Sequence, residues 1–416
     1  MSILIKNVLL DNKRKDIYME KCIIKEIGNT INQEAEFKLD GRNKAAVPSF
    51  INAHTHAAMT LFRGYADDMP LHEWLQDKIW PTEAKLTEQD VYWGSKLACL
   101  EMVKSGTTFF NDMYWHYHGT AKAVDEMGIR AAVSAVFIDL FDEATAREQI
   151  RLNKRLFEET KRYSSRVIFT LGPHAIYTVS EESLRWAREF ADKNNLMIHI
   201  HLSETKKEVS DCVERHKKRP VEYLDDIGFF GENVIACHVI WVNDNEIRIL
   251  KEHDVKIAHN PASNMKLSSG VFQYKKLEKE GLTIALGTDG CASNNNLDML
   301  EEMKFAALLQ KVDSAPTAMP ASEAFALATL NGAKAFNLDC GEIKEGKLAD
   351  LLLIDLKNIH LNPHHNLISN LVYAAHGSCV DTTICGGKIL MQDKKIDGEE
   401  EIIEKAGEVA LDLIEM

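Results

Sequence analysis

The chain has 416 residues, of which 45% are hydrophobic and 27% charged, so it can bury the core of one large barrel or of two domains. Its formal net charge of −14 argues against nonspecific binding to nucleic acid or to an anionic membrane, because both need clustered Lys and Arg. No apolar run reaches the roughly 18 residues that a membrane helix needs, and the first residues show no signal-peptide pattern.

The 8 cysteines are scattered, without C-x-x-C pairs or a regular framework. In a chain of this length such cysteines are typical of free thiols in a reducing compartment. We therefore predict a cytoplasmic location.

Residues 1–47 open the chain with short apolar runs at 3–10 and 22–27 and a turn at Asp40-Gly41. This pattern predicts β-strands, but too few residues are available to bury a core alone. We expect this segment to pair with another part of the chain.

From residue 48 to about 340, strand-like apolar runs alternate with amphipathic helical stretches. The helix candidates include 88–104, 145–161, 181–193, 208–227 and 297–309, with Thr87 and Ser180 as caps. The strand candidates are a run ending at His54, then 107–110, 130–137, 167–171, 197–202, 234–238, 255–258 and 283–287. Eight such units predict a closed, TIM-like (β/α)₈ barrel. A doubly wound open sheet is the alternative, and no G-x-G-x-x-G follows the first strand to favour it.

The last part of the chain returns to strand patterns, at 350–355 and in a hairpin at 382–391, before an amphipathic helix at 399–416. We expect the two ends to form one small β-sandwich, since domain termini commonly lie close together. The predicted organisation is residues 1–47 and 344–416 as the two parts of the sandwich and its helix, and 48–343 as the barrel.

Reactive side chains of such barrels lie where the strands end. Six predicted strands end in His or Asp, which is too regular to be a coincidence of ordinary core histidines. These residues are His54, His56, His174, His199, His201, His238, His259 and Asp289.

The spacing of these residues favours one metal ion. His54 and His56 are two residues apart and share a strand face, and zinc accepts nitrogen and oxygen ligands while keeping a position open for water. We select His54, His56, His201 and Asp289 as ligands. Strand four offers no lysine to bridge two metals, which favours a mononuclear site. His199 is expected to pack or to support a ligand, and His259 to be structural.

Two further residues are candidates for proton chemistry. Glu204 follows His201 by three residues and could shuttle a proton, with a helix-capping role as the alternative. His238 is expected to lie near the metal, off its coordination sphere, where it could hydrogen-bond the attacking hydroxide.

Several motifs make the chain resemble the amidohydrolase superfamily, and within it the 5′-methylthioadenosine and S-adenosylhomocysteine deaminases. They are PSFINAHTH (48–56), IWPTEAKLT (79–87), GPHAIYT (172–178), HIHLSET (199–205), HNPASNMKLSSG (259–270) and LGTDGCASNNNLDMLEEM (286–303). The resemblance implies metal-dependent hydrolytic deamination of an adenine nucleoside to an inosine-type product and ammonia, with the metal on His54, His56, His201 and Asp289.

The resemblance also implies roles for other residues. Glu204 would protonate the ring nitrogen N1, His238 would hold the hydroxide and Asp289 would accept a proton. Glu83 would bind the ribose hydroxyls, His174 would contact the nucleoside, and Arg147 would approach the 5′ substituent.

One departure from the family pattern bears on specificity. The loop after the third barrel strand should carry a second arginine in members that handle the homocysteine group, but residues 136–140 read VFIDL. A carboxylate on the substrate would lack a bidentate partner and would face Asp139. We therefore expect a preference for 5′-methylthioadenosine, 5′-deoxyadenosine or adenosine over S-adenosylhomocysteine.

The sequence leaves alternatives open. Another amidohydrolase acting on a guanine-like base, a triazine or a pterin is the first rival, and a catalytically inactive barrel with a structural role is the second. The metal is expected to be Zn²⁺, with Fe²⁺ equally compatible with these ligands. We expect a small-molecule partner, no nucleic acid and no membrane, while a homo-oligomer stays open.

Overall fold

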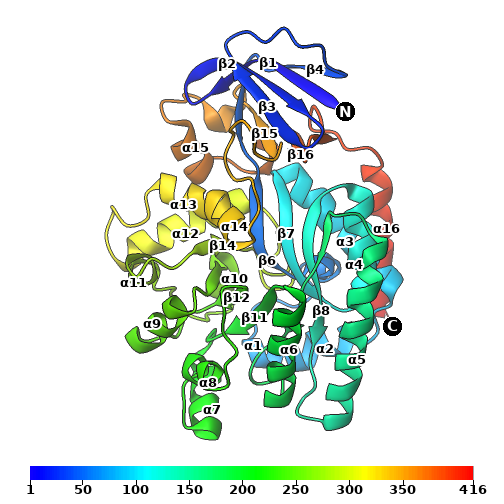
Figure 1. Ribbon diagram of the computed structural model, residues 1–416, viewed down its shortest axis with the longest axis vertical. Coiled ribbons are helices and arrows are strands. Elements are labelled where there is room, and N and C mark those ends of the chain that lie inside the picture. The colour runs from blue at the N-terminus through cyan, green and yellow to red at the C-terminus, as the bar shows by residue number, and fades with distance from the viewer. Residues whose placement is uncertain (416) are drawn as a thin grey trace.

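The computed structural model describes residues 1–415, apart from the side chains at positions 72 and 415. A barrel ringed by helices forms the larger part, and a sheet built from both ends of the chain lies beyond one end of it (Figure 1). None of the helices in the described residues combines the length and the apolar character needed to cross a bilayer.

The barrel strands follow one another in chain order and pair in parallel. Their interior side chains form one hydrophobic cluster, in which Phe336 packs against Phe109 with ring centroids 4.8 Å apart. The strands are β6 (Phe50–Thr55), β7 (Thr107–Tyr114), β8 (Arg130–Phe137), β9 (Val167–Phe169), β10 (Gly172–Pro173), β11 (Ile198–Leu202), β12 (Val234–His238), β13 (Lys256–His259) and β14 (Ile284–Leu286).

Two contacts close the circle between the two groups of strands. Leu171 bridges to Ile198 in parallel, which joins β9 and β10 to β11. On the other side the backbone N–H of Asp289 donates to the carbonyl of His54 at 3.0 Å, next to β14 and β6. Because β9 and β10 together form the fourth position, the described residues contain the eight predicted strand positions, and the barrel prediction is confirmed.

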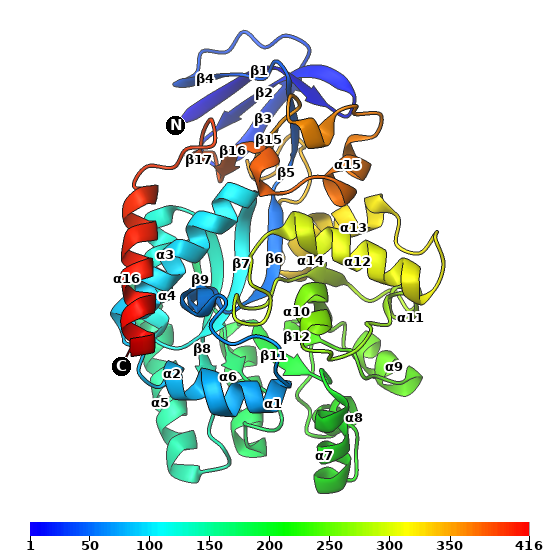
Figure 2. The same cartoon turned by 180° about the vertical axis from the view of Figure 1, so that it is seen from behind.

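The helices cover the barrel on its outer side (Figures 1 and 2). The longer ones are α3 (Glu88–Ser105), α4 (Tyr117–Met127), α5 (Glu143–Glu159), α6 (Glu181–Asn194), α7 (Lys206–His216), α8 (Pro220–Asp226), α9 (Asp244–Glu252), α12 (Met299–Asp313), α13 (Ala321–Ala328) and α16 (Glu399–Glu415). The shorter ones are α1 (Leu71–Trp74), α2 (Trp80–Glu83), α10 (Pro261–Lys266), α11 (Tyr274–Lys279), α14 (Leu330–Ala335) and α15 (Leu367–Tyr373). Short 3₁₀ helices lie at η1 (Ala57–Phe62), η3 (Thr160–Arg162), η4 (Ile359–Leu361) and η5 (Gly377–Cys379), and a π-helical segment lies at η2 (Leu75–Ile79).

Local chemistry explains how these helices begin and end. Thr87 caps α3 in a capping box with Asp90, and Ser180 caps α6, as the sequence predicts. The prediction of a single helix over residues 208–227 is wrong. Lys217 adopts a left-handed φ of 58°, and Pro220 begins α8, so the stretch divides into α7 and α8.

The terminal sheet joins both ends of the chain in the order β17-β16-β15-β5-β1-β2-β3, with β4 paired to β1. The predicted association of the termini is therefore confirmed, while a two-layered sandwich stays a prediction. The strands are β1 (Ser2–Leu10), β2 (Lys13–Glu20), β3 (Ile23–Gly28), β4 (Phe37–Asp40), β5 (Lys44–Pro48), β15 (Leu351–Asp355), β16 (Val380–Cys385) and β17 (Lys388–Met391).

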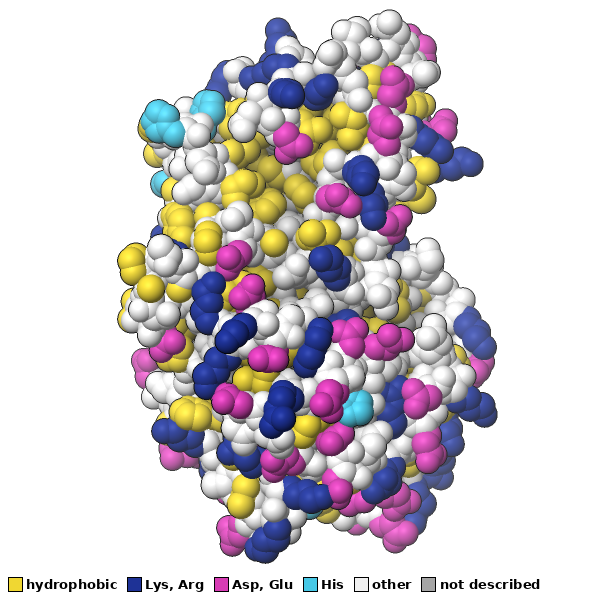
Figure 3. Space-filling view, turned by 60° about the vertical axis from the view of Figure 1, so that its left-hand side comes forward, with side chains coloured by type: hydrophobic (Ala, Val, Ile, Leu, Met, Phe, Trp, Pro, Cys, Tyr) yellow, Lys and Arg dark blue, Asp and Glu magenta, His cyan; other side chains and the backbone are white. Residues whose placement is uncertain are grey.

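The connection between the two parts sets the direction of the barrel. Only Ser49 separates β5 from β6, so β6 starts at the terminal sheet and its carboxyl end points away from it (Figure 1). Short helices α1 and α2 lie toward that distant end (Figure 2). On the face seen in Figure 3, acidic and basic side chains are interspersed over the lower half and apolar ones gather in the upper half.

Candidate metal centre and active site

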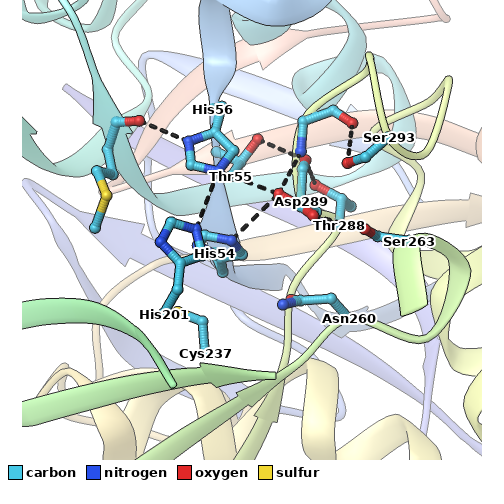
Figure 4. Close-up of polar contacts among 12 residues, drawn as sticks. His54, Thr55, His56, His201, Cys237, Asn260, Ser263, Thr288, Asp289 and Ser293 are labelled. Atoms are coloured by element: carbon cyan, nitrogen blue, oxygen red, sulfur yellow. Dashed lines mark hydrogen bonds and ion pairs between the residues drawn. The ribbon is translucent and has the colours of Figure 1, made fainter. Parts of the chain in front are cut away.

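Two strand ends bring two histidines and a carboxylate together. His54 is the fifth residue of β6, His56 follows the strand, and Asp289 follows β14 with a left-handed φ of 61°. The Nε2 atoms of His54 and His56 each lie 3.2 Å from Oδ1 of Asp289 (Figure 4). The shared strand face predicted from their spacing therefore makes both rings converge on one oxygen.

His201 completes the cluster from β11. Its Nε2 lies 3.3 Å from Nε2 of His56, and its ring centroid lies 4.9 Å from that of His54. His54, His56 and His201 can each offer a ligand atom to one point, and so can His54, His238 and Asp289. The structure thus brings together all four ligands selected from the sequence.

The far side of each ligand is held by the protein. His56 Nδ1 donates to the carbonyl of Met113 at 2.7 Å, and His201 Nδ1 donates to the carbonyl of His174 at 2.9 Å. Because a carbonyl only accepts, both rings carry a proton on Nδ1, which leaves Nε2 as the atom that faces the cluster. Such outer partners are typical of histidines that bind metals.

The electrostatics of the cluster fit a cation. Burial lowers the pKa of His54 to about 4, so its imidazole is neutral, and among the described residues its buried Nε2 makes no hydrogen bond of good geometry, although Asp289 Oδ1 lies 3.2 Å away. Burial opposes a charge on Asp289, but the imidazoles of His54 and His56 outweigh it and lower the pKa of the carboxyl group well below its usual range. Burial also opposes a charge on His56, yet Asp289 raises its pKa to about 9. These residues fit a divalent metal, because they offer buried nitrogen and oxygen donors that lie close together.

Glu204 and His238 flank this cluster. Glu204 Oε2 lies 3.9 Å from Nε2 of His238, while Oε1 accepts from the hydroxyl of Ser269 at 3.0 Å. His238 Nδ1 lies 2.8 Å from Oδ1 of Asn264, so the ring donates there and keeps Nε2 toward the pocket. Both residues line one cavity with His56, His201 and Asp289. The capping alternative for Glu204 does not describe its side chain, which enters this cavity.

The same cavity reaches two other predicted residues. Glu83 ends α2 and is 8% exposed, and its Oε2 accepts from the indole N–H of Trp115 at 3.2 Å. Burial raises the pKa of Glu83, because the charged form of a carboxyl group at the pocket wall loses its hydration. His174 faces the pocket, with its Nδ1 bonded to Thr178 Oγ1 at 2.8 Å. Glu83 and His174 therefore line the same cavity as the ligand cluster.

Arg147 is not brought to this pocket. It lies on the outer surface of α5, 60% exposed, and pairs with Glu143 at 2.7 Å. The prediction that Arg147 approaches the substrate is therefore corrected. Its i,i+4 partner, Glu143, lies on the solvent face of α5 and holds the guanidinium outside the pocket.

The expectation that Asp139 faces the substrate is corrected as well. Its carboxylate is fully buried and accepts from the backbone N–H groups of Phe141 at 2.9 Å and of Ser180 at 3.0 Å, so it supports its own loop and does not face a substrate. The pocket wall here consists of Val136 and Ile138, and Ile138 also lines an adjoining apolar cavity with Leu140.

His199 and His259, which are expected from the sequence to be supporting and structural residues, are both buried. His199 Nε2 lies 2.8 Å from Nδ1 of His54 and 3.1 Å from Cys237 Sγ, which fits a supporting role behind the ligand. His259 stacks on Phe272 at 4.2 Å, and burial lowers its pKa to about 3. A neutral stacked ring is consistent with the expected structural role.

Sequence reasoning missed several residues that support the site. Ser263 donates to Asp289 Oδ2 at 2.6 Å, and Asn264 and Ser269 hold His238 and Glu204. Trp74 on α1 lines the pocket as well. The serines and the asparagine lie within the HNPASNMKLSSG motif, which from sequence alone indicates only the family resemblance.

A model of the Amidohydrolase family matches residues 45–390 of this chain. The chain belongs to the amidohydrolase family. This amidohydrolase is 52% identical over 392 residues to 5-methylthioadenosine/S-adenosylhomocysteine deaminase 1 of Archaeoglobus fulgidus, a match that covers 93% of this chain and 92% of that protein. It is 49% identical over 421 residues to a 5′-deoxyadenosine deaminase of Methanoregula boonei, covering 99% of this chain and 95% of that one.

Among solved structures, this amidohydrolase is similar to an adenosine deaminase from Xanthomonas campestris with bound zinc. The TM-score is 0.94 at 32% sequence identity, and the match covers 100% of this chain and 99% of the other. The whole architecture, including the terminal sheet, is therefore shared with that enzyme.

Proposed function

We propose that this amidohydrolase deaminates an adenine nucleoside hydrolytically, giving the inosine-type nucleoside and ammonia. The observation that carries the proposal is the pairing of two features in one cavity. A four-residue ligand cluster with Glu204 and His238 lies at one end, and the buried Glu83 lies in the wall. The deaminases at about 50% identity support the choice of substrate class.

The metal would be held by His54, His56, His201 and Asp289. A bound divalent metal lowers the pKa of water from about 15.7 to about 7 and so supplies a nucleophile at neutral pH. We propose Zn²⁺, supported by the zinc in the similar adenosine deaminase structure. Fe²⁺ suits the same nitrogen and oxygen donors, and elemental analysis of the purified protein distinguishes the two.

The protein's own groups would move the protons. As water oxygen bonds to C6 of the ring, Asp289 takes a water proton and Glu204 delivers one to N1, which localises the ring electrons. His238 orients the attacking oxygen through its open Nε2. Asp289 would then pass its proton to the exocyclic nitrogen, the C6–N bond would break and ammonia would leave. The hydroxyl on C6 would return its proton to Glu204 and become the carbonyl, while N1 keeps the proton that it received, so atoms and charges balance.

The rest of the nucleoside would extend away from the cluster. Glu83 would accept hydrogen bonds from the ribose hydroxyls, and His174 would contact the nucleoside. The 5′ substituent would meet the apolar wall of Val136 and Ile138. Because the described residues that line this wall include no Lys or Arg to pair with a carboxylate, we propose a preference for 5′-deoxyadenosine, 5′-methylthioadenosine or adenosine over S-adenosylhomocysteine. Steady-state kcat/KM on these four nucleosides tests this, and a clear advantage for S-adenosylhomocysteine would contradict it.

The organisation predicted from the sequence is kept as a proposal. Residues 48–343 would form the catalytic barrel, and residues 1–47 and 344–416 a β-sandwich unit with its helix. The terminal sheet lies at the amino end of β6, away from the ligand cluster, so it would have no part in the chemistry. Helix α16 belongs to the same hydrophobic cluster as Met59 and Trp74, which line the pocket.

The substitution Glu204→Gln tests the proposed chemistry. The amide keeps the shape of the side chain but cannot deliver the proton, and removing a general acid typically lowers kcat by about 10²–10⁴-fold. Metal content should stay at the wild-type level, because Glu204 is outside the ligand cluster. Unchanged ammonia release by this variant would exclude the role.

A further inference from the structure

Glu208 is a buried carboxylate that the proposed chemistry does not use. It lies in the first turn of α7 and is 4% exposed. Its Oε1 accepts from the backbone N–H of Ser203 at 2.7 Å, and its Oε2 accepts from the backbone N–H of Glu204 at 2.8 Å. One carboxylate thus binds the backbone of the residue that would carry the proton.

This contact differs from an ordinary helix cap. Thr205 is the N-cap of α7 and accepts from the N–H of Glu208, so Glu208 holds the third helical position. In a capping box that carboxylate returns to the N–H of the cap itself. The Glu208 carboxylate instead accepts from the N–H groups of Ser203 and Glu204, the two residues that precede the cap, and both belong to the turn at the end of β11.

The chain offers a matched ordinary cap nearby. Glu246 holds the same position in α9, is fully buried, and accepts from the N–H of its own cap, Asn243, at 2.9 Å. It also pairs with Arg219 at 2.6 Å. Both glutamates are buried helix caps, but only Glu208 touches Glu204.

The turn that Glu208 holds is a constrained one. Ser203 adopts a left-handed φ of 52°, and its carbonyl accepts from the N–H groups of Ile240 at 3.1 Å and Trp241 at 2.9 Å. A left-handed serine is uncommon and persists where its surroundings fix it. Glu208 binds the N–H side of this turn and the chain after β12 binds its carbonyl side.

We propose that Glu208 is a positioning residue that fixes the backbone of Glu204, so that the Glu204 carboxylate reaches the substrate at the correct angle. The inference rests on the proposed role of Glu204 in proton transfer. Ser269 holds one carboxylate oxygen at 3.0 Å, and the other lies 3.9 Å from His238 Nε2. Glu208 supplies the remaining constraint, at the main chain.

The substitution Glu208→Gln removes one of the two acceptor oxygens, and Glu208→Ala removes both. Misplacing a catalytic group by about 1 Å can lower the rate by about 100-fold. We expect kcat to fall by about 10-fold in Glu208→Gln and about 100-fold in Glu208→Ala, while KM and metal content stay within about 2-fold of wild type. If Glu208→Ala fails to fold, Glu208→Gln carries the test alone.

Glu246→Gln is the control for loss of a buried helix cap. It should lower the melting temperature as much as Glu208→Gln does, yet leave kcat within about 2-fold of wild type, since a cap acts on helix stability. A kcat loss in Glu208→Gln no larger than in Glu246→Gln would overturn the inference.

A double variant separates this inference from the proposed function. If Glu208 acts through Glu204, Glu208→Gln should have no further effect on the residual kcat of Glu204→Gln, because residues that act as a unit are not additive. An additive further loss would overturn the positioning role. Wild-type activity in Glu204→Gln alone would instead show that the proposed role of Glu204 is wrong.

Discussion

The ligand cluster and the entrance to the pocket lie in one cavity but are built in different ways. His54, His201 and Asp289 lie in or within three residues of buried barrel strands, and each is also bound on its far side. The entrance is formed by α1, α2 and the loop after β8, which are short segments with apolar faces such as Trp74 and Ile138. We infer that the barrel strands position the groups for the chemistry, and that side chains of the short helices and of the loop set the choice of substrate.

The largest effect is expected when the cluster loses a ligand. Asp289→Ala removes the oxygen that lies 3.2 Å from both His54 and His56. Metal content should fall to near zero, and activity should fall by more than about 100-fold, since losing even an outer partner typically costs about 10–100-fold. Elemental analysis and ammonia release measure the two. Ser263→Ala, which removes only a hydrogen bond to Asp289, should show a smaller loss, and retained metal in Asp289→Ala would refute the assignment.

A smaller effect is expected in the wall of the pocket. Glu83→Gln should lower kcat/KM for adenine nucleosides by about 10–100-fold, the loss of roughly 1.5–3 kcal/mol for a hydrogen bond to a charged group. Metal content should not change. Trp115→Phe is the matched control, because it keeps an aromatic ring and removes only the indole donor to Glu83. An equal loss on adenine as a free base would show that Glu83 does not bind the ribose.

The raised pKa of Glu83 gives the same residue a pH signature. Burial raises this pKa, so Glu83 binds its proton at a higher pH than an ordinary glutamate does. KM for the nucleoside should therefore rise as the pH falls through this pKa, where the anion that accepts from the ribose is lost. Glu83→Gln should show no such rise over the same range. Parallel pH profiles of KM for the two proteins would contradict this assignment.

Specificity at the entrance should change with one side chain. Ile138→Arg places a guanidinium in the wall that adjoins the apolar cavity. The ratio of kcat/KM for S-adenosylhomocysteine to that for 5′-deoxyadenosine should rise by about 10-fold, from a charge-assisted pair with the substrate carboxylate. Ile138→Leu controls for the change of shape. An unchanged ratio would place the 5′ group elsewhere.

The smallest effect is expected at Arg147. Since it pairs with Glu143 on the solvent face of α5, Arg147→Ala should change kcat/KM for every nucleoside by less than about 2-fold. A selective loss with S-adenosylhomocysteine would mean that the helix carries a substrate contact that this geometry does not provide.

The sequence was most informative where local rules act. Strand periodicity alone places His54 and His56 on one face, and apolar runs locate the strand ends that carry His201 and Asp289. Glu83 has no local signal of this kind, and only the resemblance singled it out. Its burial arises from the packing of α2 beside Trp115, a contact between residues 32 apart in the chain.

The errors have the same physical origin. A helical pattern in residues 208–227 does not reveal the left-handed Lys217 that ends α7, and the charge of Arg147 does not reveal which face of α5 it occupies. Ser263 and Asn264 on α10, and Ser269 just after this helix, contact the site from a segment whose position depends on the closed barrel. Such long-range contacts cannot be read from neighbouring residues.

Ammonia release by the metal-loaded protein tests the central claim most directly. The substrates are 5′-deoxyadenosine, 5′-methylthioadenosine, adenosine and S-adenosylhomocysteine, with free adenine, guanine and a pterin beside them. We predict release from the adenine nucleosides, fastest for those with an uncharged 5′ group, and far slower release from the free bases and the pterin. Release from guanine or the pterin with none from any adenine nucleoside would contradict the account.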